Sequence, residues 1–330
     1  MLRMRNGSNA CRSSARASRC ASRRDVLRAA LGGAAGLALG MPVLSARPAL
    51  AQAIAGATAT RELAADLYVV TAADNNVVAL TGADGVVLVD GGSKATSAAL
   101  RTAVASLPGG GAIRTLFNTH WHPDQTGSNE ALAASGAAIV AQENTKLWLS
   151  TDVTWPWNGE TVEPLPAPAR PNQAFYTSGE LVAGGKSIRY GHLPDAPHTD
   201  GDCYVLFQQH NVLAVGGALN GDGWQLPDWW TGGWIGGLVG GLEHLLTVAN
   251  ADTRVVPARG PVLSYAQLRQ QYEMYSIVWE RLAKLLYTGR GPDEAVAAHP
   301  TREFDEQMGN PDEFVDRSFR SLWAYLTPDA

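Results

Sequence analysis

The sequence predicts one α/β domain behind a basic leader, and three observations support this fold class. Of the 330 residues, 45% are hydrophobic and 17% are charged, so the chain can bury a large core and is not disordered by composition. Strand-like and helix-like segments alternate in both halves of residues 60–330. That region contains no internal repeat and no clear linker, which makes a single domain over residues 52–330 the simplest interpretation.

The first 51 residues resemble a twin-arginine export signal. Arg23 and Arg24 precede a short apolar run over residues 29–39, and residues 49–51 form a small-x-small cleavage site ending at Ala51. A membrane anchor is the alternative, but the run is shorter than the about 20 residues needed to cross the hydrocarbon. We therefore expect cleavage after Ala51, no stable membrane anchor after cleavage, and a periplasmic or secreted protein.

Charge separates this leader from the domain. Residues 1–51 hold nine arginines and one acidic residue, so residues 52–330 carry 17 basic and 30 acidic side chains and a formal charge of −13. An acidic domain argues against nucleic-acid binding, and we expect a small-molecule substrate instead. The three cysteines, Cys11, Cys20 and Cys203, are too few for a disulfide scaffold. Cys203 begins a predicted strand, where a buried, inert thiol is expected.

The first half of the domain reads as strands with helical connections. Valine-rich runs separated by Asp, Asn and Gly predict strands, and Leu100, Val104 and Leu107 follow helical spacing. The predicted elements are strands at 67–70, 77–80 and 86–89, a helix at 94–106, a strand at 113–118, a helix near 129–135, a strand at 138–141 and a helix near 143–150.

The second half begins with a proline-rich stretch at 151–174, which predicts a long ordered loop. The later elements are strands at 181–182, 186–190, 203–208 and 212–215, a helix that ends near Ala249, a strand at 254–256 that ends at Pro257, and a helical tail from about residue 264. The tail is expected to pack against the domain or to form a dimer face. Six tryptophans in the loops, which either wall a substrate cleft or pack onto the core, are Trp155, Trp157, Trp224, Trp229, Trp230 and Trp234.

Three histidines occupy positions that suit a metal site. His120 and His122 follow a predicted strand, and in an extended segment residues two apart project to the same face. His198 supplies a third imidazole from the segment 197–202. Three nitrogen ligands with one open position are typical of catalytic zinc.

The residues around these histidines resemble the metallo-β-lactamase fold superfamily. Residues 119–129, Thr-His-Trp-His-Pro-Asp-Gln-Thr-Gly-Ser-Asn, closely resemble the family's signature loop T-H-x-H-x-D-H-x-G-x-N. Residues 86–92, 197–202 and 255–261 are similar to its early strand ending in Asp-Gly, its third-histidine loop and its terminal P-G-H-G-P loop. The resemblance extends over residues 62–265 in the family's order. It implies an αββα sandwich with the metal at one edge of the sheets.

The resemblance also implies a second metal, for which this chain lacks most of the ligands. His120, His122 and His198 match the first-metal ligands, but only Asp124 matches the second set. The positions of the other three second-metal ligands hold Gln125, Gly217 and Arg259. Glutamine is a poor zinc ligand, glycine has no side chain, and arginine is a permanent cation. We therefore expect a single metal, with Arg259 reaching Asp124 where the second ion would lie, and a buried Asp124 that depends on this partner.

The resemblance and the residue chemistry together predict a metal-dependent hydrolase. One zinc ion would activate water for attack on a lactam, lactone or thioester, while Asp124 orients the water or takes its proton. Arg259 would stabilise the oxyanion or hold a substrate carboxylate. Two alternatives remain open: a relative that binds a ligand or metal without turnover, and a mononuclear iron oxidoreductase.

The leader generates a first prediction. Replacing Arg23 and Arg24 with lysine should leave the precursor in the cytoplasm, because export through this route requires the arginine pair. Cell fractionation and the mass of the mature protein, expected to begin at Gln52, test this. Unchanged delivery of mature protein would contradict the twin-arginine interpretation.

Overall fold

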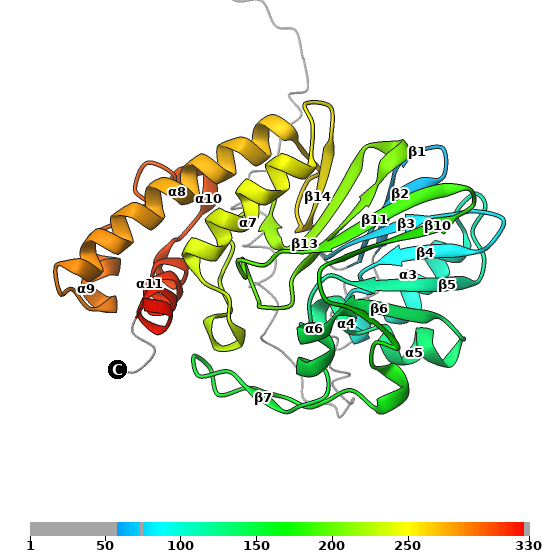
Figure 1. Ribbon diagram of the computed structural model, residues 1–330, viewed down its shortest axis with the longest axis horizontal. Helices are drawn as coiled ribbons and strands as arrows, with labels where there is room; N and C mark the ends of the chain where they lie inside the picture. The colour runs from blue at the N-terminus through cyan, green and yellow to red at the C-terminus, as the bar shows by residue number, and fades with distance from the viewer. Residues whose placement is uncertain (1–57, 73–74, 327–330) are drawn as a thin grey trace, which may run out of the picture. The chain divides into compact units, whose positions relative to one another are not determined.

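A computed structural model describes residues 58–72 and 75–326 (Figure 1). The predicted export signal and its cleavage site after Ala51 lie outside these residues. Among the helices described, none is both long enough and apolar enough to cross a bilayer.

The first half of the domain forms a mixed set of strands. Its strands, in spatial order, are β1 (Thr58–Ala64), β2 (Leu67–Ala72), β3 (Asn75–Leu80), β4 (Val86–Val89), β5 (Ile113–Asn118), β6 (Ala138–Gln142) and β9 (Gln173–Phe175). Strands β1 to β4 pair antiparallel, whereas β4, β5, β6 and β9 pair parallel. The parallel strands need crossover connections, which are provided by α3 (Ser97–Ala105), α5 (Asn129–Ala134) and α6 (Glu143–Trp148).

The second half repeats this plan in shorter form. Its strands, in spatial order, are β10 (Ser178–Ala183), β11 (Lys186–His192), β12 (Cys203–Phe207), β13 (Val212–Asn220), β14 (Arg254–Arg259) and β15 (Leu263–Ser264). Strands β13 and β14 are parallel and are connected through α7 (Ile235–Val248). A single paired position, Arg259 opposite Asn75, joins β14 to β3 and thereby links the two halves.

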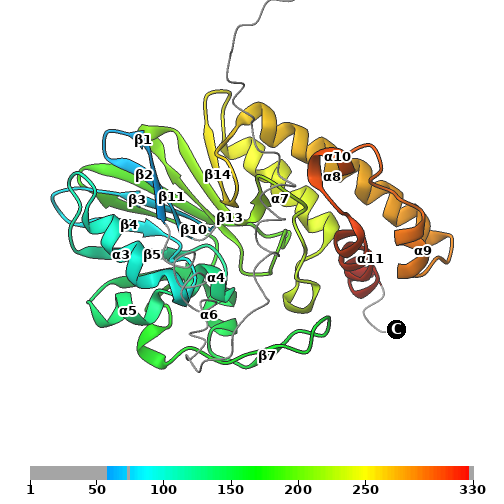
Figure 2. The ribbon, with the colours of Figure 1, turned by 180° about the vertical axis from the view of Figure 1, so that it is seen from behind.

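Three hydrophobic clusters show that the strands form two packed layers with helices outside. One cluster contains residues from both sets of strands, including Val78, Phe117, Val205 and Val256, and fills the space between them. A second cluster packs the first set against α3 and α5, and a third packs the second set against α7 and the C-terminal helices. Figures 1 and 2 show these helices on opposite sides of the strands. The αββα sandwich implied by the resemblance is confirmed.

The C-terminal tail is helical and packs on the second half. It contains α8 (Tyr265–Tyr287), α9 (Pro292–Ala297), α10 (Asp305–Met308) and α11 (Asp312–Leu326). Ser264 caps α8 with a reciprocal pair of hydrogen bonds to Gln267, which defines where the helix starts. On α11 the ring of Phe314 is fully buried and stacks on Trp224 at a centroid distance of 4.5 Å. Packing against the domain, one of the two alternatives for the tail, is therefore observed.

Two of the differences from the sequence prediction involve proline. The proline-rich segment 151–174 is not only loop, because β7 (Val153–Thr154) and β8 (Thr161–Val162) form a short hairpin within it. The predicted strand end at Pro257 is wrong, because β14 continues to Arg259. Proline cannot donate a ladder hydrogen bond, but Pro257 lies at a register shift opposite Gly216, where the regular ladder is already interrupted.

Candidate metal centre

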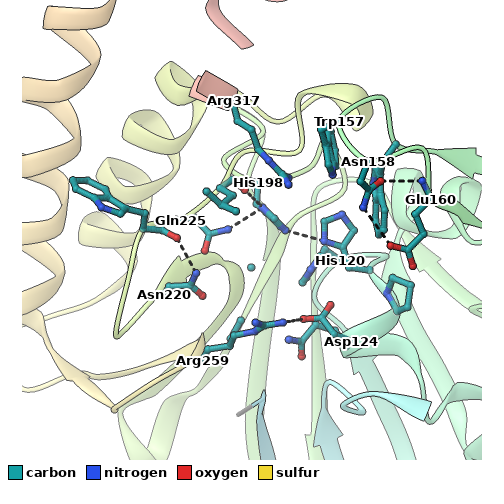
Figure 3. A pocket seen from close by; sticks show the side chains of 18 residues that line it. His120, Asp124, Trp157, Asn158, Glu160, His198, Asn220, Gln225, Arg259 and Arg317 are labelled. Atoms are coloured by element: carbon teal, nitrogen blue, oxygen red, sulfur yellow. Dashed lines mark hydrogen bonds and ion pairs between the residues drawn. The ribbon is translucent and has the colours of Figure 1, made fainter. Parts of the chain in front are cut away.

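The three predicted histidines lie together at one edge of the sandwich. His120 and His122 follow β5, and His198 comes from the loop between β11 and β12. One ring nitrogen of each lies within 4.8 Å of those of the others, and the three rings pair at centroid distances between 4.6 and 4.9 Å. All three line one cavity, in which Figure 3 shows His120 and His198 close together.

The backbone that presents His120 is a bend rather than the extended segment expected from the sequence. Residues 119 and 120 form this bend, and His122 directly precedes the short helix α4 (Pro123–Thr126). The buried carboxylate of Asp90 holds the bend, accepting hydrogen bonds from the Thr119 N–H at 2.9 Å and the Thr119 hydroxyl at 2.8 Å. Burial raises the pKa of Asp90 to about 7, although the hydrogen bonds from Thr119 oppose the shift. The rings therefore converge through a side-chain-anchored turn and not through strand alternation.

A second buried carboxylate shapes the loop that carries His198. Asp202 accepts hydrogen bonds from the backbone N–H of His198 at 2.6 Å and of Thr199 at 2.9 Å. Burial raises the pKa of Asp202 to about 7, again against its hydrogen bonds. The spacing of His198 and Asp202 thus closes a tight loop that points the imidazole into the cavity.

Each histidine has one ring nitrogen near an acceptor on the protein. His122 donates from Nε2 to Asp228 Oδ2 at 2.8 Å, and His198 Nδ1 lies 2.8 Å from the Leu226 carbonyl oxygen. His120 Nδ1 lies 3.2 Å from the Thr119 hydroxyl. The opposite nitrogens, His122 Nδ1 and His198 Nε2, face each other at 3.0 Å. This is the arrangement in which outer partners fix the tautomer and leave the inner nitrogens for a metal.

Two of the three histidines, His120 and His198, are also held neutral. Burial lowers the pKa of His198 to about 3, with a smaller contribution from nearby His122. Burial likewise lowers the pKa of His120 well below its ordinary range. Only the neutral imidazole can donate a lone pair to a metal, so these ligands do not have to lose a proton first. The donor set fits one divalent ion.

Asp228 contacts the histidine cluster and was not among the residues predicted from the sequence. Its side chain is 1% exposed and accepts hydrogen bonds from His122, from the indole of Trp155 at 3.3 Å and from the backbone N–H groups of Trp230 and Thr231. Burial raises the pKa of Asp228, but the hydrogen bond and charge of His122 outweigh this effect, so the pKa lies below its usual range. An acid three residues before a threonine, in a loop dense in tryptophan, was the available signal.

The residues at the second-metal positions form an ion pair. Arg259 Nη2 donates to Asp124 Oδ2 at 2.6 Å, and Arg259 Nε donates to Asn75 Oδ1 at 3.1 Å (Figure 3). The expected contact between Arg259 and Asp124 is therefore present. The expectation that Asp124 is buried is wrong, since the Asp124 and Arg259 side chains are 32% and 48% exposed. Both line the cavity mouth, where solvent already stabilises the carboxylate.

Neither Gly217 nor Gln125 is suited to be a ligand of a second metal, and the reason differs between the two. A Cβ at residue 217 would lie 2.5 Å from His198 Cδ2 and 2.8 Å from His120 Cε1, so any side chain there requires the metal-binding rings to shift. Gln125 is fully buried, and its Oε1 has no hydrogen-bond partner among the described residues. The backbone at Gly217 thus packs against the histidines, and neither residue supplies a ligand for a second metal.

The cavity above the histidines has a volume of about 530 Å³. Three of the six loop tryptophans line it, namely Trp155, Trp157 and Trp224, so these form a wall of the cleft. Trp234 instead stacks on Tyr325 at 3.7 Å, which is a packing role. Cys203 is buried and burial raises the pKa of its thiol, as expected for an inert cysteine.

Comparisons with known proteins agree with this architecture. A family model described as the metallo-beta-lactamase superfamily matches residues 70–272, more than half of the chain. The fold is similar to a metallo-beta-lactamase from Pontibacter korlensis, with a TM-score of 0.52, 18% identity, and coverage of 67% of this chain and 99% of that one. It is also similar to DIM-1 metallo-beta-lactamase, with a TM-score of 0.53, 15% identity, and coverage of 66% and 97%. A search among curated proteins gave no significant match.

The hydrogen bond between Asp228 and His122 generates a prediction. Asp228→Asn should lower zinc affinity about 10- to 100-fold, because an outer carboxylate orients the ligand and strengthens its basicity. Competition with a chromogenic chelator measures this. Asp252→Asn, at an exposed carboxylate remote from the cavity lining, is the matched control. Equal zinc affinity in wild type and Asp228→Asn would show that the bond does not support metal binding.

Proposed function

Because the chain belongs to the metallo-beta-lactamase superfamily, we propose that it is a hydrolase that uses one zinc ion to activate water against a carbonyl substrate. The observation that carries this proposal is the convergence of three histidines, of which burial keeps His120 and His198 neutral, in a large cavity. A zinc ion held there would supply Lewis acidity and lower the pKa of a bound water towards about 7. Lactams, lactones and thioesters are the substrate classes proposed.

Asp124 is the residue proposed to orient that water or to accept its proton. Its position at the start of α4 places the carboxylate on the cavity wall next to the histidines. Arg259 holds one carboxylate oxygen, and Asn75 donates from Nδ2 to the Asp124 carbonyl at 3.0 Å. Both the side chain and the backbone of Asp124 are thereby fixed, as is required of a group that must meet water in one orientation.

Arg259 is proposed to stabilise negative charge that develops on the substrate. Its Nε and Nη2 are used by Asn75 and Asp124, whereas Nη1 has no hydrogen-bond partner within the described part of the chain. A guanidinium that is already fixed through two of its nitrogens loses little further conformational entropy when its third nitrogen binds an oxyanion. The same cation occupies the neighbourhood in which relatives of this fold place a second metal.

We also propose that the protein acts after export, in the periplasm or outside the cell. The paired arginines, the short apolar run and the small-x-small site of the leader support this location.

Metal content tests the proposed function. Purified mature protein should retain one equivalent of zinc by elemental analysis, and His120→Ala or His198→Ala should retain none, since either leaves two nitrogen ligands. Hydrolysis of a panel of lactams, lactones and thioesters should be lost on chelation and return with zinc.

Other outcomes of the metal analysis would contradict the proposed function. Two tightly held metals would overturn the argument from Gln125, Gly217 and Arg259. One iron would favour the oxidoreductase, and zinc binding without turnover of any panel member would favour a non-catalytic binder.

Arg259→His tests the ion pair. The variant should still bind a single zinc, because Gln125 and Gly217 contribute no ligand, and hydrolysis should be lost. Its free energy of unfolding should change by no more than about 1 kcal/mol, because the pair with Asp124 is half-exposed and screened. Elemental analysis and urea unfolding measure both quantities. Uptake of a second zinc by this single variant would show that the missing ligands at Gln125 and Gly217 are not what excludes a second ion.

A further inference from the structure

A second arginine reaches the cavity from the C-terminal helices. Arg317 lies on α11 and lines the same cavity as the histidines. Figure 3 shows Arg317 and Arg259 on opposite sides of His198. Arg317 lies beyond residues 70–272, the part of the chain that the family model matches.

The side chain of Arg317 is held firmly and is only 14% exposed. Its guanidinium carbon lies 4.1 Å from the centroid of the Trp157 ring, a cation–π contact. Nη2 donates to Glu313 one turn earlier on the helix. The Nε atom is buried and has no hydrogen-bond partner among the described residues. The guanidinium is therefore fixed in position while part of its donor capacity is unused.

An aromatic row connects this arginine with the metal centre. Trp157 stacks on Trp155 with centroids 5.8 Å apart, and Trp155 contacts the ring of His122 at 5.6 Å. The β7–β8 hairpin thus forms an apolar wall with the histidines at one end and Arg317 at the other. A ligand lying along this wall would present its reacting group to the histidines and its other end to Arg317.

The charges around the cavity favour a monoanion at Arg317. Arg259 is already paired with Asp124. Glu160 also lines the cavity, and Glu313 neutralises part of the Arg317 charge, so a dianion would meet more repulsion than a monoanion. The planar fork of a guanidinium matches a carboxylate.

We propose that Arg317 binds a carboxylate of the substrate, so that helix α11 forms part of the substrate site. The proposal rests on the proposed function only in treating this cavity as the place where substrate binds. It narrows the substrate class to carbonyl compounds that carry a carboxylate and a flat or apolar segment between the two groups.

Binding of benzoate and benzamide to metal-free mature protein tests this without any catalysis. The two probes match in shape and differ in charge, and removal of zinc prevents the carboxylate from binding the metal instead. Ligand-observed NMR should show benzoate binding about tenfold more tightly than benzamide, the scale of a charged hydrogen bond. Arg317→Gln should abolish this preference and leave benzamide affinity unchanged.

Arg320→Gln is the matched control, because Arg320 also pairs with an acid four residues earlier on α11 but does not line the cavity. It should keep the benzoate preference. Glu313→Gln tests whether Arg317 recognises the carboxylate or has only a structural role. If Arg317 binds benzoate, removing the competing Glu313 carboxylate should tighten benzoate binding. If Arg317 has only a structural role, benzoate affinity should not increase.

Three results would overturn the proposal: benzoate preference retained in Arg317→Gln, lost equally in Arg320→Gln, or not improved in Glu313→Gln. A wild-type protein with no preference would do so as well. These outcomes are independent of zinc content and hydrolysis, so a failure of the proposed function is recognised separately from a failure of this site.

Discussion

The site depends on the buried carboxylate of Asp228. Its two oxygens accept hydrogen bonds from a histidine, an indole and two backbone N–H groups, and its own N–H donates to the His198 carbonyl at 2.9 Å. One residue therefore connects two histidines, the β7–β8 hairpin through Trp155, and the loop that leads into α7. A buried charge is costly unless its lone pairs are satisfied, and this dense bonding supplies the compensation. The same bonds fix the geometry on which metal binding depends.

On the opposite side of the site, the Arg259–Asp124 ion pair lies where the family resemblance implies a second metal ion. Arg259 lies at the single position where β14 pairs with β3, so it joins the two halves of the sandwich and contacts Asp124 at the same point. The guanidinium supplies a fixed positive charge that is covalently attached to β14 and held by hydrogen bonds to Asn75 and Asp124. Exchange of a divalent ion for this cation keeps attraction for negative charge but gives up a second centre for polarising substrate or water.

The strands and the histidines could be predicted from the sequence because both depend on local patterns. Valine runs and turn residues located β2 to β4. The His-x-His pair with its flanking residues located the candidate metal ligands. The contacts of Asp228 with His122 and of Asn75 with Arg259 could not be predicted in this way, because each joins segments that are distant in the chain. Arg317 is 119 residues from His198, in a helix whose pattern indicates only packing. The burial expected for Asp124 also failed, because exposure at the mouth of a cavity is a property of the assembled fold.

Close packing explains why residue 217 is a glycine and has no side chain that could bind a second metal. The backbone at Gly217 approaches the rings of His120 and His198 so closely that a Cβ would overlap them. The glycine therefore has a positive role, since it lets the first-site histidines pack against β13. Gln125, Gly217 and Arg259 lie around the same cavity. Together with Asp124 they form an alternative to a second ion. Gly217 leaves room for the histidine rings, Gln125 contributes a buried amide, and Arg259 provides a positive charge. In a site built in this way, the three histidines alone could hold a metal ion. The side chains that the hairpin and α11 add around the cavity are then the ones available to contact a substrate.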